Sequence, residues 1–121
     1  MLVRLIQPLR PDGRDERTSL SLDRDYTVLA IECGTYRLLN DFGEPTLYDR
    51  DAFACTCNER PTFWVSIHNN ENDYDGPECW NAPGYFEDWH DHVPSVKLEF
   101  KQTVNLHYPE REPDLIPRKR R

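Results

Sequence analysis

The sequence predicts a mainly β domain with a small α part. Its 121 residues are close to the usual size of one domain. Short runs rich in β-branched and aromatic residues alternate with turn signals about every ten residues, a spacing typical of a small barrel or sandwich. Aromatic residues make up 12% of the chain, and disordered chains are poor in them. We therefore expect a folded domain with polar loops.

The first half of the chain begins with a predicted strand and a loop. A strand is expected over residues 3–9, before a Pro-Asp-Gly turn signal. Residues 10–24 are polar and are expected to form a long exposed loop. The β-rich run 26–33 ends at Gly34, and strand character resumes over 36–40, so this region predicts a hairpin.

Turns and strands continue to alternate through the middle of the chain. Residues 41–45 form the next predicted turn, and a strand with one interruption is expected over 46–57. Another strand is expected over 63–68. The segment 69–84 is turn-rich and acidic, and residues 85–89 are expected to form a short helix after it.

The segment 93–108 fits two patterns. Apolar residues at a helical spacing, such as Val96, Phe100 and Val104, indicate a helix. Strict alternation of apolar and polar residues fits a strand and covers more positions. Pro94 would lie in the first helical turn, where proline is favoured, and we expect the helix.

One domain is expected over residues 1–108, followed by a charged, Pro-rich tail over 109–121. A chain of this size has room for one modest hydrophobic core. The residues expected to supply much of this core are Val28, Leu29, Ile31, Leu38, Leu47, Phe53, Trp64 and Val65.

The segment 26–57 resembles the small SH3-like or Sm-like barrel. The matching parts are a strand, its hairpin partner, the Asp-Phe-Gly-Glu turn, the Leu-Tyr pair and the closing strand around Phe53. SH3-like barrels place a short 3₁₀ turn before the last strand, and residues 49–51 would occupy it. The resemblance implies a five-stranded barrel with a helical C-terminal extension. One departure is residues 1–10, which look like a strand where Sm proteins begin with a helix.

The whole chain is also similar to small uncharacterised bacterial proteins that carry a Gly-Tyr-Phe-Glu-Asp-Trp-His-Asp-like element, here residues 84–91. Proteins of this kind are often immunity or accessory proteins of toxin systems. This resemblance implies a protein that binds another protein and has no catalytic role.

Net charge and hydropathy narrow the function classes. The net charge is −7, and an acidic surface repels phosphate backbones and anionic membranes. No apolar stretch is long enough to span a membrane, and the N-terminus lacks the apolar region of a signal peptide. We therefore expect a cytoplasmic protein with reduced cysteines and no membrane contact.

The sharpest candidate for a metal site combines Cys55 and Cys57 with His90 and His92. Thiolates and imidazoles suit zinc, and such a site would belong to a metal-dependent hydrolase. However, structural zinc sites usually leave two to four residues between paired cysteines, and here one residue separates them. We expect these cysteines to be small core or surface residues, with no bound zinc and no other cofactor.

Two further patterns resemble catalytic or ion-binding sites. Carboxylates and histidines gather over residues 87–92, but no nucleophile is recognisable among them, and acids in a first helical turn suit the helix dipole. Asp73 and Asp75 have the spacing of a calcium loop. The twelfth position of that loop is Gly84, where an EF-hand needs glutamate. The sequence therefore predicts a protein that is not an enzyme.

An acidic and aromatic stretch is the most distinctive feature of the chain. No lysine or arginine occurs over residues 61–96, and residues 71–91 hold five large aromatics among acids. Aromatic anchors ringed by charge are typical of protein interfaces, and a negative field speeds the approach of a basic partner. The residues expected to bind a basic protein are Asp73, Tyr74, Asp75, Trp80, Tyr85, Glu87, Asp88, Trp89 and Asp91.

Two alternatives stay open beside this protein-binding module. The aromatics equally fit a role in the core, over the open end of the barrel, with the acids as a solvated face. An Sm-like fold would instead favour RNA binding, by fold analogy alone. RNA needs a positive track on the barrel, whereas the arginines concentrate in residues 10–24 and in the tail.

Overall fold

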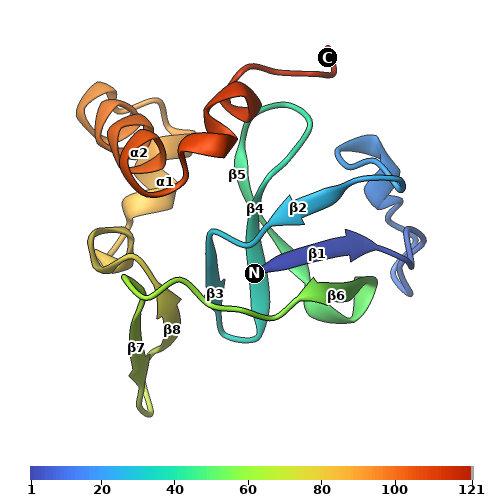
Figure 1. Cartoon of the computed structure of the whole chain (residues 1–121), viewed down its shortest axis with the longest axis horizontal. Coiled ribbons are helices and arrows are strands. Elements are labelled where there is room, and N and C mark those ends of the chain that lie inside the picture. The colour runs from blue at the N-terminus through green and yellow to red at the C-terminus, as the bar shows by residue number, and fades with distance from the viewer. Residues whose placement is uncertain (121) are drawn as a thin grey trace.

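The computed structural model describes residues 1–120, which form eight strands, two α-helices and four 3₁₀ helices (Figure 1). The strands are β1 (Leu2–Leu5), β2 (Asp25–Thr27), β3 (Ala30–Glu32), β4 (Thr35–Leu39), β5 (Pro45–Asp49), β6 (Phe53–Cys57), β7 (Val65–His68) and β8 (Asp73–Gly76). The helices are η1 (Glu16–Thr18), η2 (Arg50–Ala52), η3 (Glu78–Asn81), α1 (Tyr85–His90), α2 (Pro94–His107) and η4 (Pro109–Leu115). Within residues 1–120, none of the helices has the length and apolar character needed to cross a bilayer.

The strands form two open antiparallel sheets. One has the order β2-β1-β6, and the other has the order β5-β4-β3-β8-β7. The predicted mainly β class with a small helical part is confirmed. The sheets are not closed into a barrel, and eight strands stand where five were expected.

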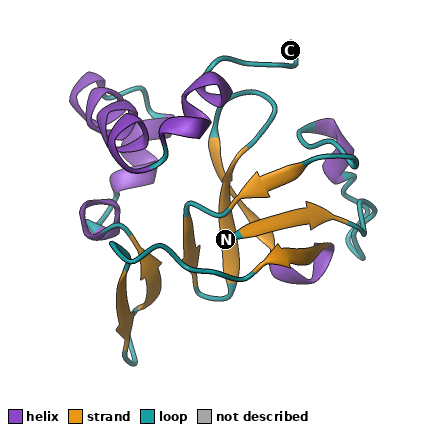
Figure 2. Ribbon diagram, in the orientation of Figure 1, coloured by secondary structure: helices purple, strands orange, loops and turns teal. Residues whose placement is uncertain are grey.

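The five-stranded sheet lies between the three-stranded sheet and the two α-helices (Figure 2). Successive residues of a strand point to opposite faces, and β4 shows both environments. Tyr36 and Leu38 join a core cluster with Val3 and Phe53 of the three-stranded sheet. Leu39 joins a second cluster under the helices. The molecule therefore has two hydrophobic cores, one on each face of this sheet.

The second core is mostly aromatic. It contains Leu29, Leu39, Trp80, Tyr85, Phe86, Trp89, Phe100, Val104 and Tyr108. Trp80 lies at its centre, with ring centroids 5.9 Å from Phe86, 4.9 Å from Phe100 and 6.1 Å from Tyr108. This core fixes α1 and α2 on the outer face of the five-stranded sheet.

The run expected as one strand over residues 26–33 is two strands, because the chain changes sheets within it. The amide of Val28 donates to the Met1 carbonyl at 2.9 Å, and the amide of Leu29 donates to the Arg37 carbonyl at 2.9 Å. Val28 belongs to the first core and Leu29 to the second, and both are fully buried. A continuous apolar run is needed here because the chain crosses between two cores.

Both predicted helices are confirmed. Residues 85–90 form α1, and 94–107 form α2 with Pro94 in its first turn. The alternating pattern that also fitted a strand is wrong, because the buried positions of α2 follow helical spacing at Phe100 and Val104. The segment 69–84, expected to be rich in turns, also contains β8 and η3.

Residues 10–24, expected to form an exposed loop, are buried in part. Leu20 is 1% exposed and belongs to the first core. Arg10 and Glu16 are also buried, and Arg10 forms an ion pair with Asp51. This loop covers the first core through Leu20, although most of its residues are polar. Its polar composition therefore led to the wrong prediction that the whole loop is exposed.

The expected tail also requires correction, because its described part, 109–120, packs on the domain. Asp114 in η4 is 6% exposed, and the amide of Lys119 donates to the Asp41 carbonyl at 2.9 Å. Gly43 lies beneath η4 with φ of 73°, and a Cβ there would come within 2.7 Å of the Leu115 carbonyl oxygen. The turn over residues 41–45 is thus shaped to receive this segment.

Most of the expected core is confirmed. The buried members are Val28, Leu29, Ile31, Leu38 and Phe53. Trp64 and Val65 are only partly buried. Leu47 is 39% exposed, so the prediction that it belongs to the core is wrong. It pairs with Arg37 across β4 and β5, on a face that α1 leaves partly open.

Candidate functional site

The structure buries the aromatic half of the predicted binding surface. Tyr74 and Trp80 are each 2% exposed, Tyr85 is 9% exposed and Trp89 is 7% exposed. Their side chains therefore cannot anchor a partner at the surface of this structure, and their expected exposure is corrected. A domain with two cores and few aliphatic residues needs its large aromatics inside.

The acidic half of that surface is mostly exposed. Asp73, Glu87, Asp88 and Asp91 are exposed to solvent. Asp75 is buried, and its Oδ2 lies 3.3 Å from Nη1 of Arg60. Binding of a basic partner by the exposed acids stays a prediction.

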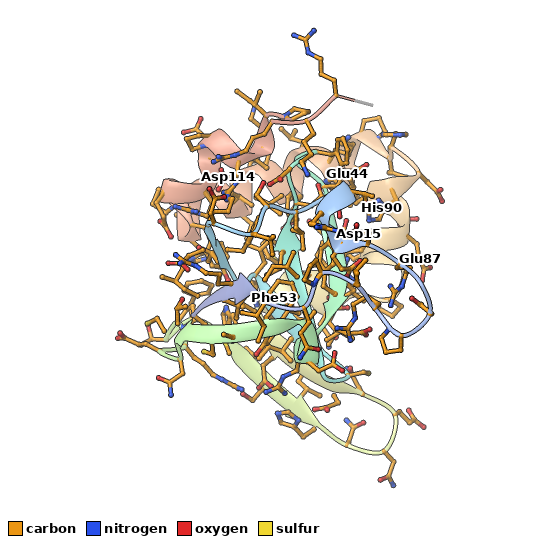
Figure 3. The ribbon with its side chains drawn as sticks, turned by 90° about the vertical axis from the view of Figure 1, so that its right-hand side faces the viewer. Asp15, Glu44, Phe53, Glu87, His90 and Asp114 are labelled. Carbon is orange, nitrogen blue, oxygen red and sulfur yellow. The ribbon has the colours of Figure 1, made fainter. Side chains whose placement is uncertain are left out.

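Glu87 and Asp91 border a cavity that we call the acidic groove. It has a volume of about 710 Å³ and lies between α1 and the strands β3 to β5. The sheet contributes Glu32, Arg37 and Leu47, and α1 with its C-cap residue contributes Tyr85, Phe86, Glu87, His90 and Asp91. Figure 3 shows Glu87 and His90 on the same side of the molecule. Trp80, Asn81, Ala82 and Gly84 complete its lining.

Arg37 brings a buried positive charge to this groove. Its guanidinium lies over the Phe86 ring, 3.6 Å from the centroid, and its Nη1 donates to the Pro45 carbonyl at 2.9 Å. Its Nη2 and Nε donate to the two carboxylate oxygens of Glu32. Because this bidentate pair satisfies the guanidinium within the chain, Arg37 has little positive charge to offer a ligand.

Glu87 lies on α1, and Asp91 caps its C-terminal end, where the Asp91 amide donates to the Glu87 carbonyl at 2.9 Å. His90 lies between them, with its Nε2 3.2 Å from the Pro45 carbonyl oxygen that Arg37 also binds. The lining holds three carboxylates, those of Glu32, Glu87 and Asp91, and one guanidinium, that of Arg37, which pairs with Glu32. The groove therefore carries two uncompensated negative charges when His90 is neutral.

The acidic groove also offers apolar surface. Leu47 is 39% exposed and lies in the same lining as Glu87 and Asp91. Burial, and then the hydrogen bond to Glu99, raise the pKa of Tyr85, so its hydroxyl stays neutral. An apolar wall beside carboxylates suits the aliphatic stem and cationic head of a lysine or arginine side chain.

No protein-family model, curated protein or solved structure matches this chain. The geometry of the groove is therefore the basis for assigning a function.

The structure does not assemble the candidate zinc ligands. Cys55 and Cys57 lie on β6 in the three-stranded sheet, whereas His90 ends α1 on the other side of the five-stranded sheet (Figure 1). Among residues 1–120, no group of three or more histidines, cysteines, aspartates or glutamates is placed to hold a metal ion. The hydrolase hypothesis built on Cys55, Cys57, His90 and His92 thus lacks its site.

A second polar cluster lies on the β7–β8 hairpin. The two ring nitrogens of His68 contact Asp73 through Nδ1 and Asp75 through Nε2, the latter at 3.1 Å. The hydrogen bonds from His68 to Asp75 and then to Asp73 raise the pKa of His68 above its usual 6.5. Burial acts to raise the pKa of Asp75, but hydrogen bonds from Ser66 and His68 outweigh it and lower the value.

We expect the His68 imidazole in the folded protein to titrate above the pKa of histidine in an unstructured peptide. The protonated imidazolium then stabilises the hairpin fully at pH values below the pKa of histidine in the unfolded chain. This contribution disappears as the pH rises through the higher pKa of the folded state. An NMR titration of the His68 ring protons measures the value. In the Asp73→Asn variant the pKa should fall, and an unperturbed value in the parent protein would contradict the contacts.

Sequence reasoning missed the sheet side of the groove. Glu32, Arg37 and Leu47 come from three strands, and the register that places Arg37 opposite Leu47 is not visible in the sequence. The one local signal was Arg37 itself, a charged residue inside an apolar run. A buried arginine in a strand needs a nearby carboxylate, and Glu32 is the nearest acid in the hairpin.

Proposed function

We propose that this protein is a non-enzymatic binding module whose acidic groove receives a basic segment of a protein partner. The observation that carries the proposal is the pairing of two uncompensated carboxylate charges with the exposed apolar side chain of Leu47 in one cavity. A lysine or arginine of the partner would place its stem on Leu47 and its charge between Glu87 and Asp91.

The surroundings of α1 support a basic partner. No lysine or arginine occurs over residues 61–96, so neither residue type stands near Glu87 on α1 or beside Asp91 in the sequence. The chain as a whole carries a net charge of −7. Such a field attracts a basic protein over distances of about a Debye length and increases the association rate.

The immunity-protein role and the SH3-like or Sm-like arrangement belong to the same proposal. What supports the arrangement is the order of elements over residues 25–57, where a hairpin, a further strand, the 3₁₀ turn η2 and a closing strand follow one another. An immunity protein would use the acidic groove to bind a nuclease toxin. Such a toxin is commonly basic because it binds nucleic acid.

The proposal is tested by selecting phage-displayed random peptides on the immobilised protein. We expect the selected peptides to be enriched in arginine and lysine. A synthetic copy of a selected peptide should bind the Glu87→Gln/Asp91→Asn double variant at least about tenfold more weakly, as measured by fluorescence polarisation. The salt dependence of binding should also decrease in this variant.

Asp88→Asn is the matched control, because Asp88 is exposed on the same helix but does not line the acidic groove. It should change the affinity less than about twofold, in line with an exposed charge outside the contact. Equal losses of affinity in both variants would show that the peptide is attracted by net charge alone, and would contradict the groove as the binding site. Peptides without a basic excess, or tighter binding of a single-stranded RNA oligonucleotide, would do the same.

A further inference from the structure

A second cavity, which we call the apolar groove, continues from the acidic groove along the same side of the molecule. Its volume is about 680 Å³, and it lies between α2, η4 and the turn over residues 41–45. Trp89, Phe100 and Leu115 line it. Leu98 and Ile116 also line it, and they are 57% and 71% exposed. Exposed large apolar side chains that gather at one cavity mark a contact site more often than scattered ones do.

The two grooves share His90 in their linings. Figure 3 shows Glu44, His90 and Glu87 one after another on this side of the molecule. Glu44 lines the apolar groove and Glu87 lines the acidic groove, so His90 marks the junction between them. One extended segment can therefore contact both grooves without leaving the surface.

The charges of the two grooves differ. In the lining of the apolar groove, Lys97 and Lys101 offset Glu44 and Glu112. The Lys97 ammonium lies 4.3 Å from the centroid of the Trp89 ring, which keeps a positive charge at the rim. This cavity has no net attraction for a cation, and its exposed surface is apolar. It complements an uncharged apolar side chain.

We propose that the partner segment is bipartite, with a basic part in the acidic groove and an adjacent large apolar side chain in the apolar groove. This inference rests on the proposed function and specifies its ligand. A protein that contacts both parts would bind peptides that are only basic more weakly, and so would discriminate its partner from the many basic proteins of a cell.

Two synthetic peptides of equal length test the inference. One contains only arginine, and the other has arginine in one half and leucine with tryptophan in the other half. We expect the bipartite peptide to bind at least about tenfold more tightly. Replacing Leu98 and Ile116 by aspartate should remove this advantage without weakening the binding of the arginine peptide, because both side chains are exposed and outside the acidic groove and the added carboxylates do not repel arginine.

Leu106→Asp is the matched control, since Leu106 is 74% exposed on α2 and does not line the apolar groove. It should preserve the advantage of the bipartite peptide. Equal affinity of the two peptides, or an equal loss of the advantage in the Leu106→Asp variant, would contradict the proposal of a bipartite segment. Neither result would contradict the proposed role of the acidic groove. Insensitivity of both peptides to Glu87→Gln/Asp91→Asn would instead overturn the proposed function. Self-association through this face, detected by light scattering and lost in the Leu98→Asp/Ile116→Asp variant, would assign the groove to a second copy and overturn the inference.

Discussion

Replacing Asp41 by alanine is expected to lower the free energy of unfolding by about 3–5 kcal/mol, because it leaves the buried Tyr26 hydroxyl without its acceptor and removes a carboxylate that pairs with Arg24. Asp41 is 1% exposed, and its carboxylate accepts hydrogen bonds from Tyr26 Oη at 2.8 Å and Ser21 Oγ at 2.7 Å. It also pairs with Arg24 at 3.3 Å and Lys119 at 3.5 Å. Burial raises the pKa of Tyr26 to about 12, so this donor stays protonated at physiological pH.

Urea unfolding followed by circular dichroism measures this loss. Asp12→Ala is the control, since Asp12 also pairs with an arginine, Arg14, but its side chain is 57% exposed. An exposed pair of this kind contributes little to stability, because water screens it. Similar losses in the two variants would contradict a special role for the buried carboxylate.

The second large effect is expected at Trp80. Truncation to alanine should cost about 3–5 kcal/mol of stability, because the indole is 2% exposed and packs against three rings of the second core. The sequence had assigned Trp80 to a binding surface, and the two assignments predict opposite results. A surface anchor would leave the unfolding transition unchanged and weaken only binding.

Thermal and urea melts of Trp80→Ala decide between these assignments. Leu106→Ala provides the control for an exposed apolar residue and should stay within about 0.5 kcal/mol of the parent protein. Phe53→Ala, in the first core, should cost a similar amount to Trp80→Ala. The two losses of stability should add in the double variant if the two cores are independent. Full stability of Trp80→Ala would show that the indole is not buried.

The parts of the fold that the sequence predicted well depend on local signals. Gly34 and the turn over residues 41–45 bound β4, and the charged break after β5 became η2. Pro94 at the start of α2 likewise favoured the helix over the strand. Each of these signals acts within a few residues, which is the range that a single sequence reveals.

The sheet partners and the burial of the aromatics could not be predicted in the same way. The crossing at Val28 and Leu29 depends on which sheet each amide meets, and that is a tertiary choice. An acidic stretch with tryptophans has the same composition whether it covers a core or presents a surface. Half of the candidate site was therefore assigned to the wrong environment, while Glu87 and Asp91 line the groove on which the proposal now rests.

The contacts of Lys119 have a consequence for how the chain is made. Its Nζ donates to the carbonyl of Leu20 at 3.2 Å, across 99 positions of sequence. Translation delivers the N-terminal sheet and its loop first, and the residues that cover that loop only much later. A nascent chain that stops before η4 lacks Asp114, whose carboxylate pairs with Arg24 in the folded protein. We expect it to stay loosely packed and accessible to chaperones until η4 and the residues after it are synthesised, since contacts so distant in sequence form slowly.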